Sequence, residues 1–162
     1  MVLKRNVAYF GLNLLGIVAC IYSLHVEISK ANDKGYVAMC DLSYRASCSK
    51  VVTSDYAKGF GIIGPLLGED SFLNVSNAAY GILLYIALIA TGFVPSLTWA
   101  SVVMQLLGLP VNFYLLYVML VVLGDVCLVC STLYTINFSL LGVSLYRWHT
   151  QCSPRTAKPH HS

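Results

Sequence analysis

Residues 99–146 read WASVVMQLLGLPVNFYLLYVMLVVLGDVCLVCSTLYTINFSLLGVSLY, and Asp125 is the only charged residue in this run. As one helix the run would be a rod of roughly 70 Å, about twice the thickness of a bilayer core. We therefore expect it to fold back on itself around Leu123, Gly124 and Asp125. This fold-back predicts two membrane-spanning helices, at 99–121 and 125–146.

Two further segments are uncharged and near the length of a membrane crossing, at residues 7–26 and 78–94. The first lacks a small-x-small cleavage pattern before the polar loop, so we interpret it as an uncleaved helix and not as a signal peptide. The sequence thus predicts an all-α membrane protein, a four-transmembrane-helix bundle in which residues 1–150 form one domain. A cap loop at 29–77 separates helices 1 and 2, and residues 151–162 form a tail.

The composition supports a membrane protein and argues against other classes. Hydrophobic residues make up 57% of the chain, charged residues 10%, and the mean hydropathy is +0.72. These values are too apolar for an ordinary soluble domain. The net charge of +3 is too small and too dispersed to indicate nucleic-acid binding. Six cysteines indicate a compartment in which disulfides form.

An even number of crossings places both termini on one side of the membrane and the 29–77 loop on the other. The tails carry basic residues and no acids, so we expect both termini to be cytosolic. The loop, with Cys40 and Cys48, then lies in an oxidising lumen, together with the turn near Asp125. Cys127 and Cys130 would share this aqueous face.

The CLVC sequence at 127–130 is the spacing of a dithiol/disulfide redox couple, and a helix start favours the thiolate. With a helix beginning near Asp125, Cys127, Cys130, Tyr134 and Asn137 would lie along one helix face. Tyr134 could then donate a hydrogen bond to a buried carbonyl. Thiols beside a membrane predict electron transfer to a lipid-soluble acceptor.

Simpler interpretations stay open for several residues. The Cys40–Cys48 pair could form a purely structural disulfide, whereas a four-cysteine zinc site is disfavoured because one pair lies at membrane depth. Buried Cys20 is expected to be inert, and Cys152 to be a free thiol. Asn77 could be a helix N-cap or a hydrogen-bond donor to a ligand between the helices. The apolar 60–67 segment is too short to span a membrane and is expected to be an interfacial anchor.

An ordered set of motifs runs along the chain: the Cys40 and Cys48 pair, GFG at 59–61, DSFLNVSN at 70–77 and CLVC at 127–130. With this set the chain resembles the vitamin K epoxide reductases, most closely their single-domain animal members. The resemblance extends from about Leu12 to Arg147. The chain departs from the family pattern at Val52, where an aromatic residue is common, and at Tyr56, where tryptophan is.

The resemblance implies a role for each site residue. Cys130 would be the catalytic thiolate that contacts the substrate, and Cys127 its resolving partner. Cys48 and Cys40 would relay electrons from a lumenal thioredoxin-like reductant, with a Cys48–Cys127 disulfide as an intermediate. The remaining substrate-binding positions are Asn77 and Tyr134, which would hydrogen-bond the quinone oxygens, and Val52, Tyr56 and Tyr80, which would line the pocket.

The sequence therefore predicts an enzyme of the endoplasmic reticulum membrane that reduces vitamin K epoxide to the quinone and the hydroquinone. Its electrons would come from thiols, and no metal or bound cofactor is expected. One alternative is a quinone-coupled thiol oxidase that supports disulfide formation in a thioredoxin-like partner. A second alternative is a non-enzymatic structural protein with four membrane helices and structural loop disulfides.

Overall fold

The computed structural model describes residues 2–43 and 45–152, which form helices, connecting loops and, as their only β pairing, two isolated bridges. Four helices are long: α1 (Val2–Asn32), α4 (Asn77–Phe93), α5 (Thr98–Tyr117) and α6 (Leu128–Cys152). The short elements are α2 (Cys48–Val52), η1 (Asp55–Ala57), η2 (Gly59–Gly61), α3 (Ile63–Leu67), η3 (Pro95–Leu97) and η4 (Val118–Val122). The all-helical prediction is confirmed for these residues.

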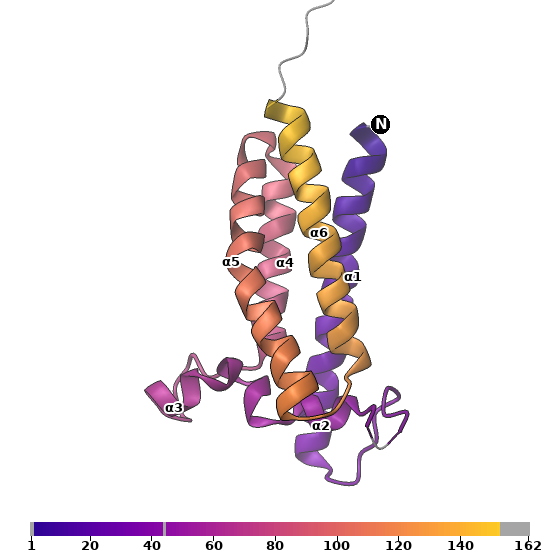
Figure 1. The fold of residues 1–162 in the computed structure, drawn as a ribbon, viewed down its shortest axis with the longest axis vertical. Helices are drawn as coiled ribbons and strands as arrows, with labels where there is room; N and C mark the ends of the chain where they lie inside the picture. The colour runs from indigo at the N-terminus through magenta and orange to yellow at the C-terminus, as the bar shows by residue number, and fades with distance from the viewer. Residues whose placement is uncertain (1, 44, 153–162) are drawn as a thin grey trace, which may run out of the picture.

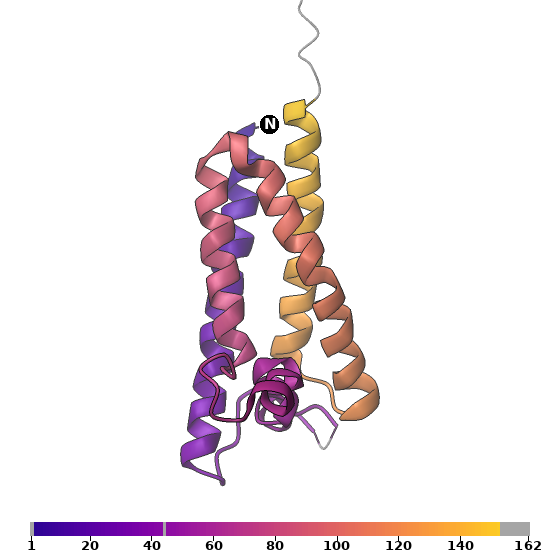
Figure 2. The same ribbon diagram turned by 90° about the vertical axis from the view of Figure 1, so that its left-hand side faces the viewer.

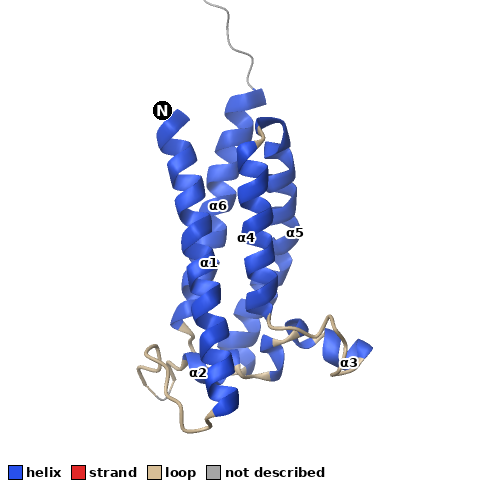
Figure 3. Ribbon diagram, turned by 180° about the vertical axis from the view of Figure 1, so that it is seen from behind, coloured by secondary structure: helices blue, strands red, loops and turns tan. Residues whose placement is uncertain are grey.

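The four long helices stand side by side as an upright bundle (Figures 1 and 3). The N-terminus and the end of α6 lie at one end of the bundle, which we call the tail end. The short helices α2 and α3 lie at the opposite end, the loop end. Three helical segments are long and apolar enough to cross a membrane, at Asn6–Asn32, Pro95–Val122 and Leu128–Gln151, and α4 is a shorter apolar helix.

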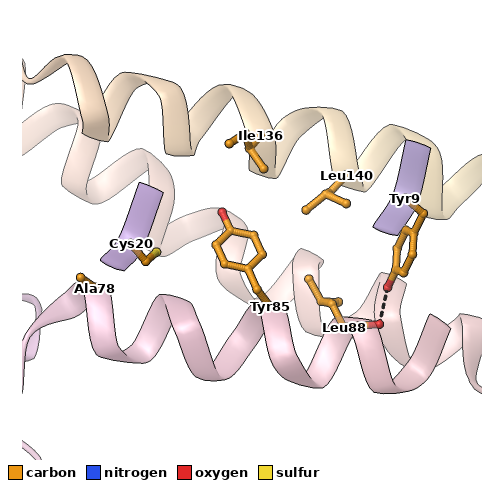
Figure 4. Close-up of a cluster of buried hydrophobic side chains, with 7 residues drawn as sticks. All are labelled: Tyr9, Cys20, Ala78, Tyr85, Leu88, Ile136 and Leu140. Carbon is orange, nitrogen blue, oxygen red and sulfur yellow. Dashed lines mark hydrogen bonds between the residues drawn. The ribbon is translucent and has the colours of Figure 1, made fainter. Parts of the chain in front are cut away.

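Side-chain contacts tie α1, α4 and α6 together near the tail end. The Tyr9 hydroxyl on α1 donates a 2.7 Å hydrogen bond to the carbonyl of Leu88 on α4, which Figure 4 shows beside the buried Leu140. The Arg147 guanidinium on α6 lies 4.1 Å from the centre of the Tyr9 ring and donates to the carbonyl of Gly92. This cation–π contact and these hydrogen bonds join three helices at one level.

Helix α5 leans away from α4 toward the loop end (Figure 2). It continues as the π-helical turn η4, and the chain then reverses at Gly124, whose φ of +64° suits a residue without a side chain. The fold-back expected around Leu123 to Asp125 is confirmed. The expected start of the last helix at 125 is wrong, because residues 124–127 form an extended link and α6 begins only at Leu128.

The other helices differ from the expected spans at their ends. Helix α1 continues beyond residue 26 to Asn32, and α6 continues beyond residue 146 to Cys152. Most of the predicted tail, at 153–162, lies outside the described residues, as does the Cys152 side chain. The apolar 60–67 segment folds as η2 and α3, and its Leu66 is 73% exposed. Its role as an interfacial anchor stays a prediction.

Candidate redox site

A cavity of about 250 Å³ opens at the loop end between the long helices. Its lining comes from the helices α1, α2, α4, α5 and α6 and from the short turns η1, η2 and η4. Six of the nine predicted site residues line it: Val52, Tyr56, Asn77, Tyr80, Cys130 and Tyr134. The lining is mostly apolar, with a few amide, hydroxyl and thiol groups, as is typical of small-molecule sites.

Cys127 is fully buried beside this cavity and caps the helix that carries Cys130. Its Sγ accepts a 3.1 Å hydrogen bond from the backbone N–H of Cys130, in the first turn of α6. A hydrogen bond from the Cys130 thiol lowers the pKa of Cys127; burial opposes this, and the backbone N–H groups of Cys130 and Val129 reinforce it. Both sulfurs are free thiols, so the pair is ready to give up two electrons.

Cys40 and Cys48 form the predicted disulfide, with Cα atoms 5.7 Å apart. The Asp41 carboxylate braces this loop by accepting hydrogen bonds from the backbone N–H of Ala38, the Ser47 hydroxyl, and both the N–H and the hydroxyl of Ser49. Partial burial would raise the pKa of Asp41, but these hydrogen bonds dominate and lower it to about 2. The brace is therefore ionised at neutral pH.

The two cysteine pairs pack together. Cys40, Cys48 and Cys127 belong to one buried cluster, against which Cys130 and Tyr134 pack. The link before α6 is fastened to the disulfide loop by a 2.8 Å hydrogen bond from the Val126 N–H to the Arg45 carbonyl, and by a Lys50–Asp125 ion pair at 3.6 Å. Cys127 thus packs in one cluster with the disulfide, while Cys130 lines the cavity.

Asn77 does not cap α4, so the N-cap prediction is wrong. Ser76 is the N-cap, and its hydroxyl accepts from the N–H of Ala78. The Asn77 side chain instead holds the 56–60 segment over the cavity. Its Oδ1 accepts from the Phe60 N–H at 2.9 Å, and its Nδ2 donates to the Tyr56 carbonyl at 2.7 Å.

The backbone conformation of Phe60 explains why these two hydrogen bonds of Asn77 are needed. Its φ of +59° is left-handed, a conformation that costs a bulky residue about 1–3 kcal/mol. Gly59 and Gly61, at φ +50° and +69°, let the chain turn tightly on either side of it. The Phe60 ring lines the cavity and stacks on Tyr80, with ring centres 5.2 Å apart. The sequence analysis noted the GFG motif but not this role.

The remaining predicted residues lie around the same space. Tyr134 is one turn of α6 beyond Cys130, and its hydroxyl has no hydrogen-bond partner within the part of the chain that the structure describes. The Tyr80 hydroxyl donates to the Leu73 carbonyl, so only its ring serves the cavity. Val52 is 5% exposed and closes the wall at α2.

Sequence reasoning missed the inner end of the cavity. Tyr85 and Asn112 line it beside Asn137, which was placed on the cysteine face of its helix but given no role. Their polarity could have indicated these residues, since Asn112 and Asn137 carry amide side chains within an otherwise apolar run. Cys20, expected to be inert, also lines the cavity from α1.

Comparison with known proteins shows the family of this chain. The sequence model of the vitamin K epoxide reductase family matches residues 7–145. The chain belongs to the vitamin K epoxide reductase family. It is 37% identical over 140 residues to vitamin K epoxide reductase complex subunit 1 of Mus musculus, covering 85% of this chain and 86% of that protein. The Rattus norvegicus protein of the same name is 35% identical over the same shares.

Membership of the vitamin K epoxide reductase family identifies the chain as an oxidoreductase with redox cysteines. Within residues 2–43 and 45–152, no three His, Cys, Asp or Glu side chains come together in a group that could hold a metal ion.

Proposed function

We propose that this protein reduces vitamin K 2,3-epoxide to the quinone, and the quinone to the hydroquinone, with electrons from thiols. One observation carries the proposal: Cys130 lines the cavity, while its partner Cys127 lies outside it, against the Cys40–Cys48 disulfide. A substrate in the cavity can meet only one thiol of the couple. The other thiol is placed to exchange with the loop.

The chemistry needs two thiols per turnover. The Cys130 sulfur bonds to an epoxide carbon, the C–O bond breaks, and the proton released by the Cys130 thiol ends on the oxygen, which becomes a hydroxyl group. Cys127 then loses its own proton to this hydroxyl group, attacks the Cys130 sulfur and breaks the C–S bond. The electron pair of the C–S bond forms the ring C=C bond and expels the protonated hydroxyl group as water. The products are the quinone and a Cys127–Cys130 disulfide.

Asn77 and Tyr134 polarise the ring oxygens in this proposal. The Asn77 amide has a second N–H beyond the one bound to the Tyr56 carbonyl, and the Tyr134 hydroxyl is available as a donor. Asn77 lies on α4 and Tyr134 on α6, and both line the same cavity. A flat ring with two opposed oxygens can therefore accept a hydrogen bond from each of them. Hydrogen bonds aimed at developing oxyanions in an apolar site are worth several kcal/mol.

A relay would restore the thiols. Cys48 attacks the Cys127–Cys130 disulfide at Cys127 after the Cys40–Cys48 disulfide has been reduced, and the resulting Cys48–Cys127 bond is then resolved by Cys40. The external reductant is a thioredoxin-like protein of the lumen. In this arrangement all four long helices cross the endoplasmic reticulum membrane, with the loop end lumenal and both termini cytosolic. The shorter α4 crosses with the others because it lies between them.

The test is turnover of vitamin K epoxide by membranes that contain the protein, with dithiothreitol as the reductant. We expect quinone from the wild type, none from Cys130→Ala, and normal turnover from Thr132→Ala, an exposed control two residues further along α6. Absence of turnover by correctly folded wild type would refute the proposal. Quinone-dependent oxidation of a thioredoxin-like protein would then favour the thiol oxidase. Absence of both activities would favour the structural protein.

A second experiment separates the relay from the active couple. Dithiothreitol is small enough to reduce the Cys127–Cys130 disulfide directly, whereas a protein reductant must work through the loop. Cys40→Ala with Cys48→Ala should therefore retain turnover with dithiothreitol and lose it with a thioredoxin-like protein. Loss with both reductants, in folded protein, would contradict the relay.

A further inference from the structure

A second, much smaller pocket lies directly behind the cavity, among α4, α5 and α6. Its volume is about 10 Å³. Its polar lining comes from Gln105, Asn112 and Asn137, and its apolar lining includes Leu84, Leu109 and Leu141. Asn112 and Asn137 line the main cavity as well, so these two amides form the wall between the two spaces.

Gln105 brings an unpaired acceptor to this pocket. Its side chain is 8% exposed, and its Nε2 donates to the Ser101 carbonyl at 3.0 Å and to the Ser144 hydroxyl at 2.7 Å. Its Oε1 is fully buried and has no hydrogen-bond partner among the residues that the structure describes. A buried acceptor left unpaired costs about 1–3 kcal/mol, so a partner at this atom would be strongly favoured.

The two asparagines supply the matching donors. The Tyr85 hydroxyl donates to Asn137 Oδ1 at 2.8 Å, Asn137 Nδ2 donates to Asn112 Oδ1 at 2.9 Å, and Asn112 Nδ2 donates to the Gly108 carbonyl at 2.9 Å. Each carboxamide has two N–H bonds and uses one of them here. The unpaired Gln105 Oε1 and two spare N–H bonds therefore belong to residues that line one pocket, whose other walls are mostly apolar.

We propose that this pocket binds a single water molecule. The water accepts an N–H from Asn112 and one from Asn137, and it donates to Gln105 Oε1. Three partners are what a buried water typically has, and about 10–15 Å³ of probe-occupied space is the least that one needs. A pocket of about 10 Å³ has room for one water molecule and no larger ligand.

The water completes a hydrogen-bonded chain across three helices, from Tyr85 on α4 through Asn137 on α6 and Asn112 on α5 to Gln105 and Ser144. Polar contacts of this kind hold membrane helices together. Here they fasten α6 to α5, the helix that leans away from α4 toward the loop end (Figure 2). The water thereby fixes the amide wall that ends the substrate cavity.

The direct test is nuclear magnetic resonance of the full chain in lipid nanodiscs, with asparagine labelled in its side-chain amide. We expect cross-relaxation between a long-lived water and the amide protons of Asn112 and Asn137. Leu141→Phe fills the pocket without removing a polar group and should abolish these signals. Leu145→Phe, the same change one turn further along α6 at a 40% exposed position, should leave them intact.

Gln105→Met provides a second variant, of similar shape but without the acceptor, and it too should abolish the signals. This variant keeps the test decisive if Leu141→Phe does not fold. Absence of water signals in the wild type would overturn the proposal. Signals that persist in either pocket variant would also overturn it, because the water would then lie elsewhere.

Discussion

Replacing Asn77 with alanine should release the 56–60 segment from the mouth of the cavity. The change removes the acceptor of the Phe60 N–H and the donor to the Tyr56 carbonyl. Both bonds are partly buried, so we take about 1 kcal/mol for each, or about 2 kcal/mol together. The left-handed Phe60 would then relax toward an ordinary φ, opposed only by its stacking on Tyr80 and by the backbone hydrogen bonds of the neighbouring residues.

A loss of about 2 kcal/mol corresponds to roughly 30-fold more frequent opening of the segment, at 1.36 kcal/mol per tenfold change. The assay is amide hydrogen exchange followed by mass spectrometry, comparing a peptide that covers 56–62 in the wild type and in Asn77→Ala. Exchange in this peptide should rise about 30-fold, while a peptide covering 41–49, braced by Asp41, should be unchanged.

The matched control is Asn74→Ala, the same substitution three residues earlier, where the side chain bonds only to the exposed Glu69. It should leave the 56–62 peptide protected. If Asn77→Ala leaves this peptide as protected as the wild type, or if both variants deprotect it equally, then Asn77 does not hold the segment and our account of Phe60 is wrong.

Two other substitutions test the loop and the bundle. Because the pKa of Asp41 is lowered from 3.8 to about 2, its contribution to stability should be complete above about pH 4 and decline as the pH falls toward 2. Thermal melts from pH 2 to 7 should show this decline in the wild type and lack it in Asp41→Asn. In the bundle, Gly81→Ala would bring a Cβ within 2.7 Å of Cys20 Sγ, and we expect a loss of about 1–3 kcal/mol in the free energy of unfolding, measured by denaturation in detergent. Adding Cys20→Ala should restore most of it, whereas Gly11→Ala, with no atom within 4 Å, should not destabilise.

The features that follow from hydropathy and chain length could be predicted from the sequence. The fold-back at Gly124 follows from an apolar run too long for one crossing, and an even helix count brings Cys40, Cys48, Cys127 and Cys130 to one end. Cys130 and Tyr134 share the cavity because a spacing of four residues is about one turn. These inferences need only helix geometry, so they do not depend on side-chain packing.

Features decided by competition among polar groups could not be predicted. Asn and Ser are both good N-cap residues, so the sequence does not say whether Ser76 or Asn77 caps α4. In the structure the Asn77 side chain accepts from the Phe60 N–H, and Ser76 is the N-cap. Cys127 was expected inside the last helix. Cys127 instead precedes α6, because its sulfur accepts a hydrogen bond from the Cys130 N–H at the start of the helix. The Val126 N–H in the link before α6 is then free to donate to the Arg45 carbonyl.

The contacts among Tyr9, Arg147 and Gly92 have a mechanical consequence. They hold α1, α4 and α6 together at the tail end, where buried side chains fill the space between these helices. The cavity is confined to the loop end, where Cys130 lines it. A lipophilic molecule that entered from the bilayer would have to pass between the helices at that end.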